Sequence, residues 1–270
     1  MIGCQTCKIF KIICTILVIQ FVLMKTFMGM KLLSALRKVK PGIKIGDKMR
    51  VLVACEYSGA VRDEFLKRGH DAHSCDILPC ESKYLNKNMI GYRQRHYQQD
   101  VLEVINEGWD LMIAHPPCTH LAVSGARWFT EGRKPWSLQE EALEFVQQLM
   151  DAPIERICIE NPVSVISSKI RKPEQIIQPY QFGHATMKTT CLWLKNLPKL
   201  KHTEVVEPEM VEMKNGKRMS KWHYETWKLP KEQRSHVRSK TFEGIAVAMA
   251  DQWGDITDEF KLENGEYEIV

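Results

Sequence analysis

The chain has 270 residues, of which 44% are hydrophobic and 26% are charged. These values are ordinary for a globular protein, and the length suits one sizeable α/β domain or one domain with a small insert. The net charge of +5 is concentrated in residues 1–48, where nine Lys and Arg face one acid and contribute +8, so the other 222 residues sum to −3. The overall charge is therefore no argument for nucleic-acid binding, and only a local basic patch could be one.

Residues 1–48 form an N-terminal extension with a 13-residue apolar run at 12–24. A membrane span needs roughly 20 residues, so we interpret the extension as a start assigned too early, with the folded domain beginning at Met49. A membrane anchor and a signal peptide are the alternatives. Nine irregularly spaced cysteines indicate a reducing cytoplasm rather than a disulfide framework. Cys4-x-x-Cys7 lacks a partner pair, so no metal site is predicted.

The first elements of the folded part predict a ligand pocket. A buried strand over 50–55, a turn over 56–59 and a helix over 60–68 form the unit with which α/β folds bind nucleotides and cofactors. A second strand ends at Asp76, where an acid can hydrogen-bond ribose hydroxyls; an ordinary turn Asp is the alternative. Asp100 is expected to cap a helix over 101–107, to face a ligand amine, or both.

A strand over 110–114 leads into His-Pro-Pro-Cys. The two prolines fix the backbone ahead of Cys118, which makes its thiol a candidate nucleophile, although a buried loop cysteine is the alternative. Ser137 and Glu140 predict a capping box for the helix that follows. The next buried strand, 156–160, ends in Glu160 and Asn161. Ligands of open α/β sheets bind at the carboxyl ends of strands, so Cys118 and Glu160 are expected to meet there.

The last third of the chain contains a basic segment. Two strands are expected over 175–180 and 189–194, and an amphipathic helix over 241–253. Between them, residues 195–240 carry twelve Lys and Arg against six acids, with Trp222, Tyr224 and Trp227 interleaved. Such residues can neutralise phosphates and stack on bases; a solvated irregular insert is the alternative.

The order of these motifs resembles that of the DNA cytosine-5 methyltransferases, in particular short phage and prophage members. The resemblance covers about residues 50–195 and 238–253, and Pro117-Cys118 and Glu160-Asn161 are its specific parts. It implies an α/β, Rossmann-like S-adenosylmethionine-dependent methyltransferase sheet with helices on both faces and a small insert. The implied organisation is an extension (1–48), a catalytic domain (49–194 with 238–254), a reduced target-recognition insert (195–237) and an acidic tail (255–270).

The resemblance also implies a mechanism. The Cys118 thiolate would attack C6 of a cytosine flipped out of DNA, and C5 would take the methyl group of S-adenosyl-L-methionine. Glu160, as a carboxyl with a raised pKa, would hold the N3 and amine edge, and Asn161 would brace the cysteine loop. The implied catalytic residues are Cys118, Glu160, Asn161, Pro117 and Lys188. The implied cofactor-binding residues are Glu56, Tyr57, Ser58, Gly59, Asp76, Ile77, Asp100 and Pro116. The protein is expected to act as a monomer without a metal.

The chain departs from the family pattern at several places. Thr119 stands where the family has Gln, Pro162 where it has Val, and Lys188 and Thr190 where arginines are usual; lysine lacks the bidentate fork of arginine. These departures leave open a catalytically inactive relative that binds nucleic acid or cofactor. The turn before Cys118 also resembles the Asp/Asn-Pro-Pro-aromatic turn of base amino-methyltransferases, with His115 in place of the acid or amide. RNA is a further possible substrate, although Glu160 favours DNA.

Overall fold

The computed structural model describes residues 48–84 and 95–255. The strands are β1 (Arg50–Ala54), β2 (Asp71–Asp76), β3 (His96–Gln98), β4 (Leu111–Ala114), β5 (Arg156–Pro162), β6 (Gln175–Ile177), β7 (Thr190–Lys195), β8 (Met210–Glu212) and β9 (Arg218–Ser220). The helices are α2 (Ala60–Lys67), α4 (Arg127–Thr130), α5 (Ser137–Met150), α6 (Ile166–Lys169), α7 (Lys221–Trp227), α8 (Lys231–Ser239) and α9 (Glu243–Gly254). Apart from Lys48 and Asp255, the predicted N-terminal extension and acidic tail lie outside the described ranges.

Seven strands form one sheet in the order β3-β2-β1-β4-β5-β7-β6. Strands β1 to β5 run parallel, whereas β7 runs antiparallel to both β5 and β6. The strand order reverses between β1 and β4, and ligands of open α/β sheets bind at such a switch point, beyond the carboxyl ends of the strands. This topology is that of a Rossmann-like methyltransferase sheet, and the predicted fold class is confirmed.

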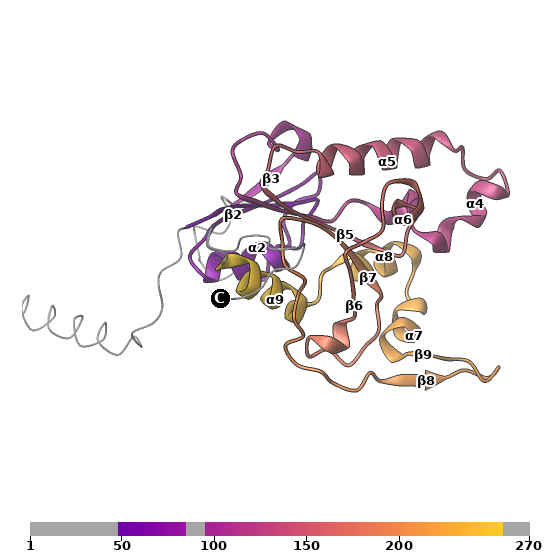
Figure 1. The fold of residues 1–270 in the computed structure, drawn as a ribbon. Helices are drawn as coiled ribbons and strands as arrows, with labels where there is room; N and C mark the ends of the chain where they lie inside the picture. The colour runs from indigo at the N-terminus through magenta and orange to yellow at the C-terminus, as the bar shows by residue number, and fades with distance from the viewer. Residues whose placement is uncertain (1–47, 85–94, 256–270) are drawn as a thin grey trace, which may run out of the picture. The chain divides into compact units, whose positions relative to one another are not determined.

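Helices cover both faces of the sheet (Figure 1). On one face α2 and α9 pack against alternate strand residues such as Val53 and Ile113, and on the other α5 packs against Leu52 and Met112. Because side chains of a strand alternate between its two faces, a central strand covered on both sides must be apolar throughout. The continuous apolar runs of β1 and β4 therefore follow from their central place in the sheet.

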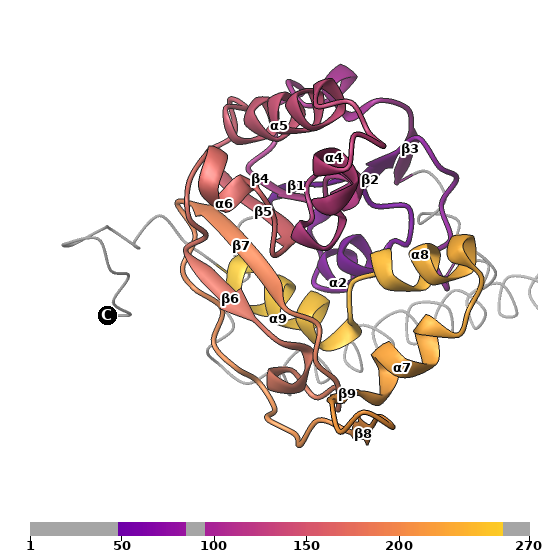
Figure 2. The same cartoon turned by 90° about the vertical axis from the view of Figure 1, so that its right-hand side faces the viewer.

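The insert between β7 and α9 folds as a hairpin, β8 with β9, followed by α7 and α8 (Figure 2). Ser220 caps the amino end of α7, where its hydroxyl accepts a hydrogen bond from the backbone N–H of His223. In the described part of the chain, no helix is long and apolar enough to cross a membrane.

Three local expectations are corrected. Ser137 is not the cap of α5: the cap is Trp136, and the helix begins at Ser137, one residue earlier than a capping box would place it. The backbone N–H groups of Leu138 and Glu140 bond to the carbonyls of Pro135 and Trp136. The expected helix over 101–107 is a short 3-10 helix, Val101–Glu103, followed by turns. The strand expected over 175–180 ends at Ile177.

Candidate active site

The turn that carries Cys118 is held by the neighbouring strand. Pro116 is buried, whereas Cys118 is exposed and begins a short 3-10 helix. The side-chain amide of Asn161 donates to the carbonyl of Pro116 at 2.8 Å. Strand β5 extends through Asn161, which pairs with Cys191 of β7, so the amide that holds the turn is itself fixed in the sheet. Among the described cysteines, Cys118 is the exposed one.

A buried ion pair lies next to this turn. His115 Nδ1 is 2.7 Å from Glu160 Oε2, and the two side chains are 8% and 11% exposed. Burial opposes the charge on His115, but its hydrogen bond to Glu160 and the charge of that carboxylate outweigh burial and raise its pKa. Burial likewise favours a neutral Glu160, yet the bond to His115 dominates and lowers the pKa of Glu160. The sequence-based expectation of a raised Glu160 pKa is therefore wrong, because His115 was not recognised as its partner.

The Cys118 thiol lies in an electrostatic field set by charged neighbours. Although the residue as a whole is exposed, partial desolvation of the thiol by the surrounding protein and the negative charge of Glu160 raise its pKa, while the charge of Lys188 opposes that increase. The thiol is consequently the stable form in the free protein near neutral pH. A reaction that uses the thiolate needs Glu160 to be neutralised or engaged as the substrate arrives.

Lys188 reaches the same region from the segment before β7. Its ammonium lies 3.4 Å from the carbonyl of Lys240 and 5.8 Å from the centre of the Phe242 ring. Lys188 and Glu160 line one small pocket together with Thr190, Thr241, Phe242 and Ile245. The chain thus brings Cys118, Glu160, Asn161 and Lys188 to the carboxyl ends of β4 and β5, although they are spread over seventy residues.

The turn between β1 and α2 is built around Glu56. Its buried carboxylate accepts hydrogen bonds from the backbone N–H groups of Val61 at 2.7 Å and Arg62 at 3.3 Å, so it satisfies two of the free N–H groups that begin α2. Burial raises its pKa, and the charge of His115 works against that rise. Glu56 therefore stabilises the turn by hydrogen bonds from its buried carboxylate to the start of α2.

Gly59 of this turn has φ +70°, and a Cβ there would come within 2.7 Å of the Arg62 guanidinium and 2.9 Å of Ser82 Cβ. We expect Gly59→Ala to lower the free energy of unfolding by about 2–3 kcal/mol, since it combines backbone strain with a clash. Gly69→Ala is the matched control, because Gly69 has φ +90° but nothing within 4 Å, and about 1 kcal/mol is expected. Urea unfolding measures both; equal losses would contradict a clash at Gly59.

The remaining residues assigned to the cofactor by resemblance lie along the same edge. Asp76 ends β2, is half-buried, and accepts a hydrogen bond from the Leu78 N–H at 2.9 Å; burial raises its pKa. Ile77, the next residue after Asp76, is 74% exposed, so its apolar side chain is not covered by the rest of the protein. Asp100 caps the 3-10 helix by accepting from the Leu102 N–H, one of the two roles expected for it.

Helix α8 of the insert lies against the β1–α2 turn. The hydroxyl of Tyr57 is 2.7 Å from that of Ser239 and donates to the carbonyl of His236 at 3.1 Å. The rings of Tyr57 and His236 lie 5.3 Å apart. The predicted insert, 195–237, thus contacts the β1–α2 turn through His236.

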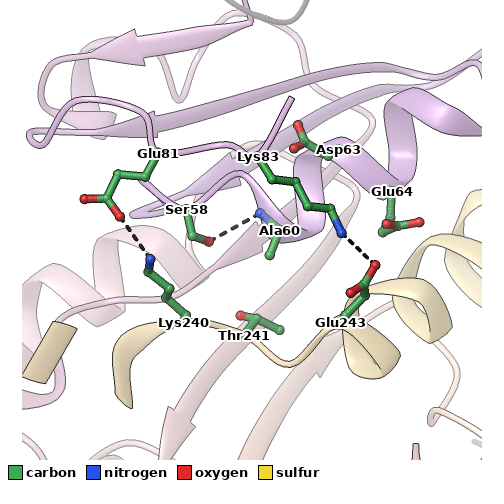
Figure 3. Close-up of a pocket in the computed structure, with 9 residues that line it drawn as sticks. All are labelled: Ser58, Ala60, Asp63, Glu64, Glu81, Lys83, Lys240, Thr241 and Glu243. Atoms are coloured by element: carbon green, nitrogen blue, oxygen red, sulfur yellow. Dashed lines mark hydrogen bonds and ion pairs between the residues drawn. The ribbon is translucent and has the colours of Figure 1, made fainter. Parts of the chain in front are cut away.

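A second pocket opens beside Ser58 (Figure 3). Two exposed ion pairs cross it: Lys240 to Glu81 at 3.0 Å, and Lys83 to Glu243 at 2.7 Å. Exposed pairs of this kind contribute about 0–1 kcal/mol each to stability. They therefore hold the segment between α8 and α9 only weakly. Sequence reasoning missed these residues because partners 159 and 160 positions apart leave no local pattern.

Cationic and aromatic side chains flank the Cys118 turn. Arg127 and Arg133 lie 4.4 Å and 4.8 Å from the ring centre of Trp128, and the Lys134 ammonium donates to the Thr119 carbonyl. In the insert, Lys228 lies 4.0 Å from the centre of the Tyr224 ring. Such pairings provide charge and stacking surface together. No group of three or more His, Cys, Asp or Glu within residues 48–84 and 95–255 could hold a metal ion.

Comparison with known proteins does not identify a family for this chain. No protein-family model and no curated protein matches the chain. A solved E. coli structure, described provisionally as a DNA modification methyltransferase encoded within a prophage, is similar at 15% sequence identity with a TM-score of 0.34. The match covers 54% of this chain and 46% of the other, which is less than half its length. At that TM-score the likeness carries no argument, so the fold class rests on the strand order of the sheet itself.

Proposed function

We propose that the protein transfers a methyl group to C5 of cytosine in DNA through a covalent bond between Cys118 and C6. The observation that carries the proposal is an exposed thiol on a rigid Pro-Pro turn, with the Glu160 carboxylate close enough to influence its pKa. The Asn161 amide, which donates to the carbonyl of Pro116, keeps the turn fixed relative to Glu160.

S-adenosyl-L-methionine, when bound, supplies the methyl group. The chemistry of the carboxyl edge fits this cofactor: Asp76 offers a half-exposed carboxylate for ribose hydroxyls, and the uncovered Ile77 offers an apolar face for adenine. Asp100 and the turn of Glu56, Tyr57, Ser58 and Gly59 would form the rest of this pocket, with Pro116 at its boundary. Gly59 keeps the turn close to α2, since any side chain there would displace Arg62.

The reaction needs two groups from the chain on opposite sides of the base. The Cys118 thiol gives its proton to solvent as the sulfur bonds to C6, and electrons of the C5–C6 double bond move through C4 to N3, where a proton delivered by the carboxyl group of Glu160 neutralises them. C5 then bonds to the methyl group. The C5 proton goes to solvent, its electron pair re-forms the C5–C6 double bond, and Cys118 leaves as a thiolate, which restores the ring. Lys188, whose charge lowers the pKa of both Cys118 and Glu160, favours the ionised thiol.

DNA is the substrate that the surroundings favour. Arg127, Arg133 and Lys134 follow the cysteine turn, and the insert adds further basic and aromatic residues. Such surfaces neutralise phosphates and stack on bases, and a duplex substrate would need its cytosine flipped out of the helix. The small insert, 195–237, predicts recognition of a short site.

The proposal is tested by sequencing 5-methylcytosine in the genome of a bacterial host that expresses the full chain. We expect 5-methylcytosine at a short recurring site, absent from a host with the empty vector. Cofactor binding by the purified protein without methylation of any DNA or RNA would instead support an inactive relative. Methyl groups confined to amino nitrogens would support the amino-methyltransferase alternative.

A further inference from the structure

We propose that His115 stores the proton that Glu160 passes to N3 of the target cytosine. The inference rests on the cytosine-5 reaction proposed above and assigns a role to a residue outside that mechanism. His115 does not touch the base; it acts through Glu160 and is therefore a positioning residue that also carries a proton.

The first argument is the geometry of the pair. β4 and β5 are parallel neighbours with Ala114 paired to Ile159, so the residues that follow, His115 and Glu160, project from adjacent strand ends on the same face. Their 2.7 Å contact is almost completely buried. A buried carboxylate whose partner is an imidazolium shares one proton with it, and that proton belongs to the pair.

The second argument is an unsatisfied atom. His115 Nε2 is buried and has no hydrogen-bond partner among the described residues. Such atoms are uncommon in folded proteins, and each costs about 1–3 kcal/mol. For a purely structural role, a neutral hydrogen-bond donor could hold Glu160 without a buried unsatisfied atom. A proton store instead needs a side chain that titrates.

The charged groups around His115 support a protonated ring. Glu160 faces it from β5, Glu56 from the β1–α2 turn and Asp76 from the end of β2, while Lys188, from the segment before β7, opposes them. The carboxylates outweigh the ammonium, and the pKa of His115 is raised although burial acts against it. The imidazolium is therefore available when substrate arrives near neutral pH.

The proton given to N3 is fully accounted for. As sulfur bonds to C6 and electrons move to N3, Glu160 gives N3 a proton and takes the Nδ1 proton of His115, leaving a neutral imidazole and a carboxylate. When the S–C6 bond breaks, the electrons leave N3, and its proton returns through Glu160 to His115. No external acid is needed for this transfer.

The pH dependence follows with a definite sign. The store is full below the pKa of the pair and empty above it, so the fraction of protein that carries the proton falls as pH rises through a value above about 6.5, the ordinary pKa of histidine. The thiolate fraction of Cys118 grows over the same range, because its pKa is raised as well. We therefore expect kcat to rise with pH below the pKa of the pair and to level off above it, so the break in the profile reports the pair.

His115→Asn is the test variant, because an Asn amide nitrogen takes the place of Nδ1 and can still donate to Glu160 but cannot give up a proton. We expect kcat for 5-methylcytosine formation at neutral pH to fall about 100-fold. The break in the pH profile should move to lower pH, because the proton must then be held by Glu160 itself, and the KM for DNA should stay unchanged. A purely structural role predicts an unchanged break, and that result would overturn the proposal.

A second measurement needs no turnover. The imidazole of His115 in the full-length wild-type protein, titrated by NMR, should show a pKa above its ordinary value, and Glu160→Gln should lower that pKa below it. An ordinary or lowered pKa in the wild type would overturn the proton store even if His115→Asn does not fold. A wild-type protein that makes no 5-methylcytosine but has the raised pKa would instead contradict the proposed reaction.

Discussion

Replacing Cys118 with alanine is expected to abolish formation of 5-methylcytosine, with a loss of at least about 1000-fold, because no other group can form the bond to C6. Stability should change by no more than about 0.5 kcal/mol, since Cys118 is exposed. Mass spectrometry of nucleosides from DNA treated with purified protein measures the first quantity, and urea unfolding measures the second.

Cys80→Ser is the matched control for that variant. Cys80 is partly exposed and accepts a hydrogen bond from Arg62, which a serine hydroxyl can replace. It should therefore retain activity within about twofold. Residual methylation by Cys118→Ala above one per cent of the wild type would show that the reaction does not depend on this thiol.

Replacing Glu160 with glutamine removes the carboxylate that holds His115 and that would pass a proton to N3 of the base. We expect kcat to fall about 100-fold or more, as for loss of a general acid–base group, while binding of the cofactor stays within about threefold. The glutamine oxygen can still accept a hydrogen bond, so the fold should persist. Steady-state kinetics and calorimetric titration of S-adenosylmethionine separate these effects.

Glu155→Gln controls for loss of a carboxylate near the same strand. Glu155 precedes the amino end of β5, and its side chain is 65% exposed. Its replacement should leave both kcat and cofactor binding unchanged. If Glu160→Gln methylated as fast as Glu155→Gln, the carboxylate beside the cysteine turn would have no part in the chemistry.

Much of the fold follows from local sequence patterns. The apolar runs of β1, β4 and β5 predicted buried strands because both faces of a central strand are covered, and Gly69 predicted the end of α2. The start of α5 was missed because Pro135 and Trp136 already make the first turn, which Ser137 then continues. A capping motif in the sequence does not reveal whether the chain has turned before it.

The candidate site was predicted less completely than the fold. Proline and acid motifs at strand ends indicated Cys118 and Glu160, because parallel strands end at one edge. The partnership of His115 with Glu160 depends on β4 and β5 being neighbours, which periodicity along one strand cannot reveal. A titratable residue directly after each of two buried strands was the available signal. The contact of Tyr57 with α8 joins segments 182 residues apart and had no such signal.

The covalent bond between Cys118 and cytosine is the central claim. It is tested by incubating the protein and S-adenosylmethionine with DNA containing 5-fluorocytosine. In this base C5 carries fluorine instead of hydrogen, so there is no C5 proton to remove and the bond from sulfur to C6 cannot break. We predict a stable protein–DNA adduct that peptide mapping locates at Cys118 and that Cys118→Ala does not form. Methylation of normal DNA at amino nitrogens, with no adduct on the fluorinated substrate, would contradict the account.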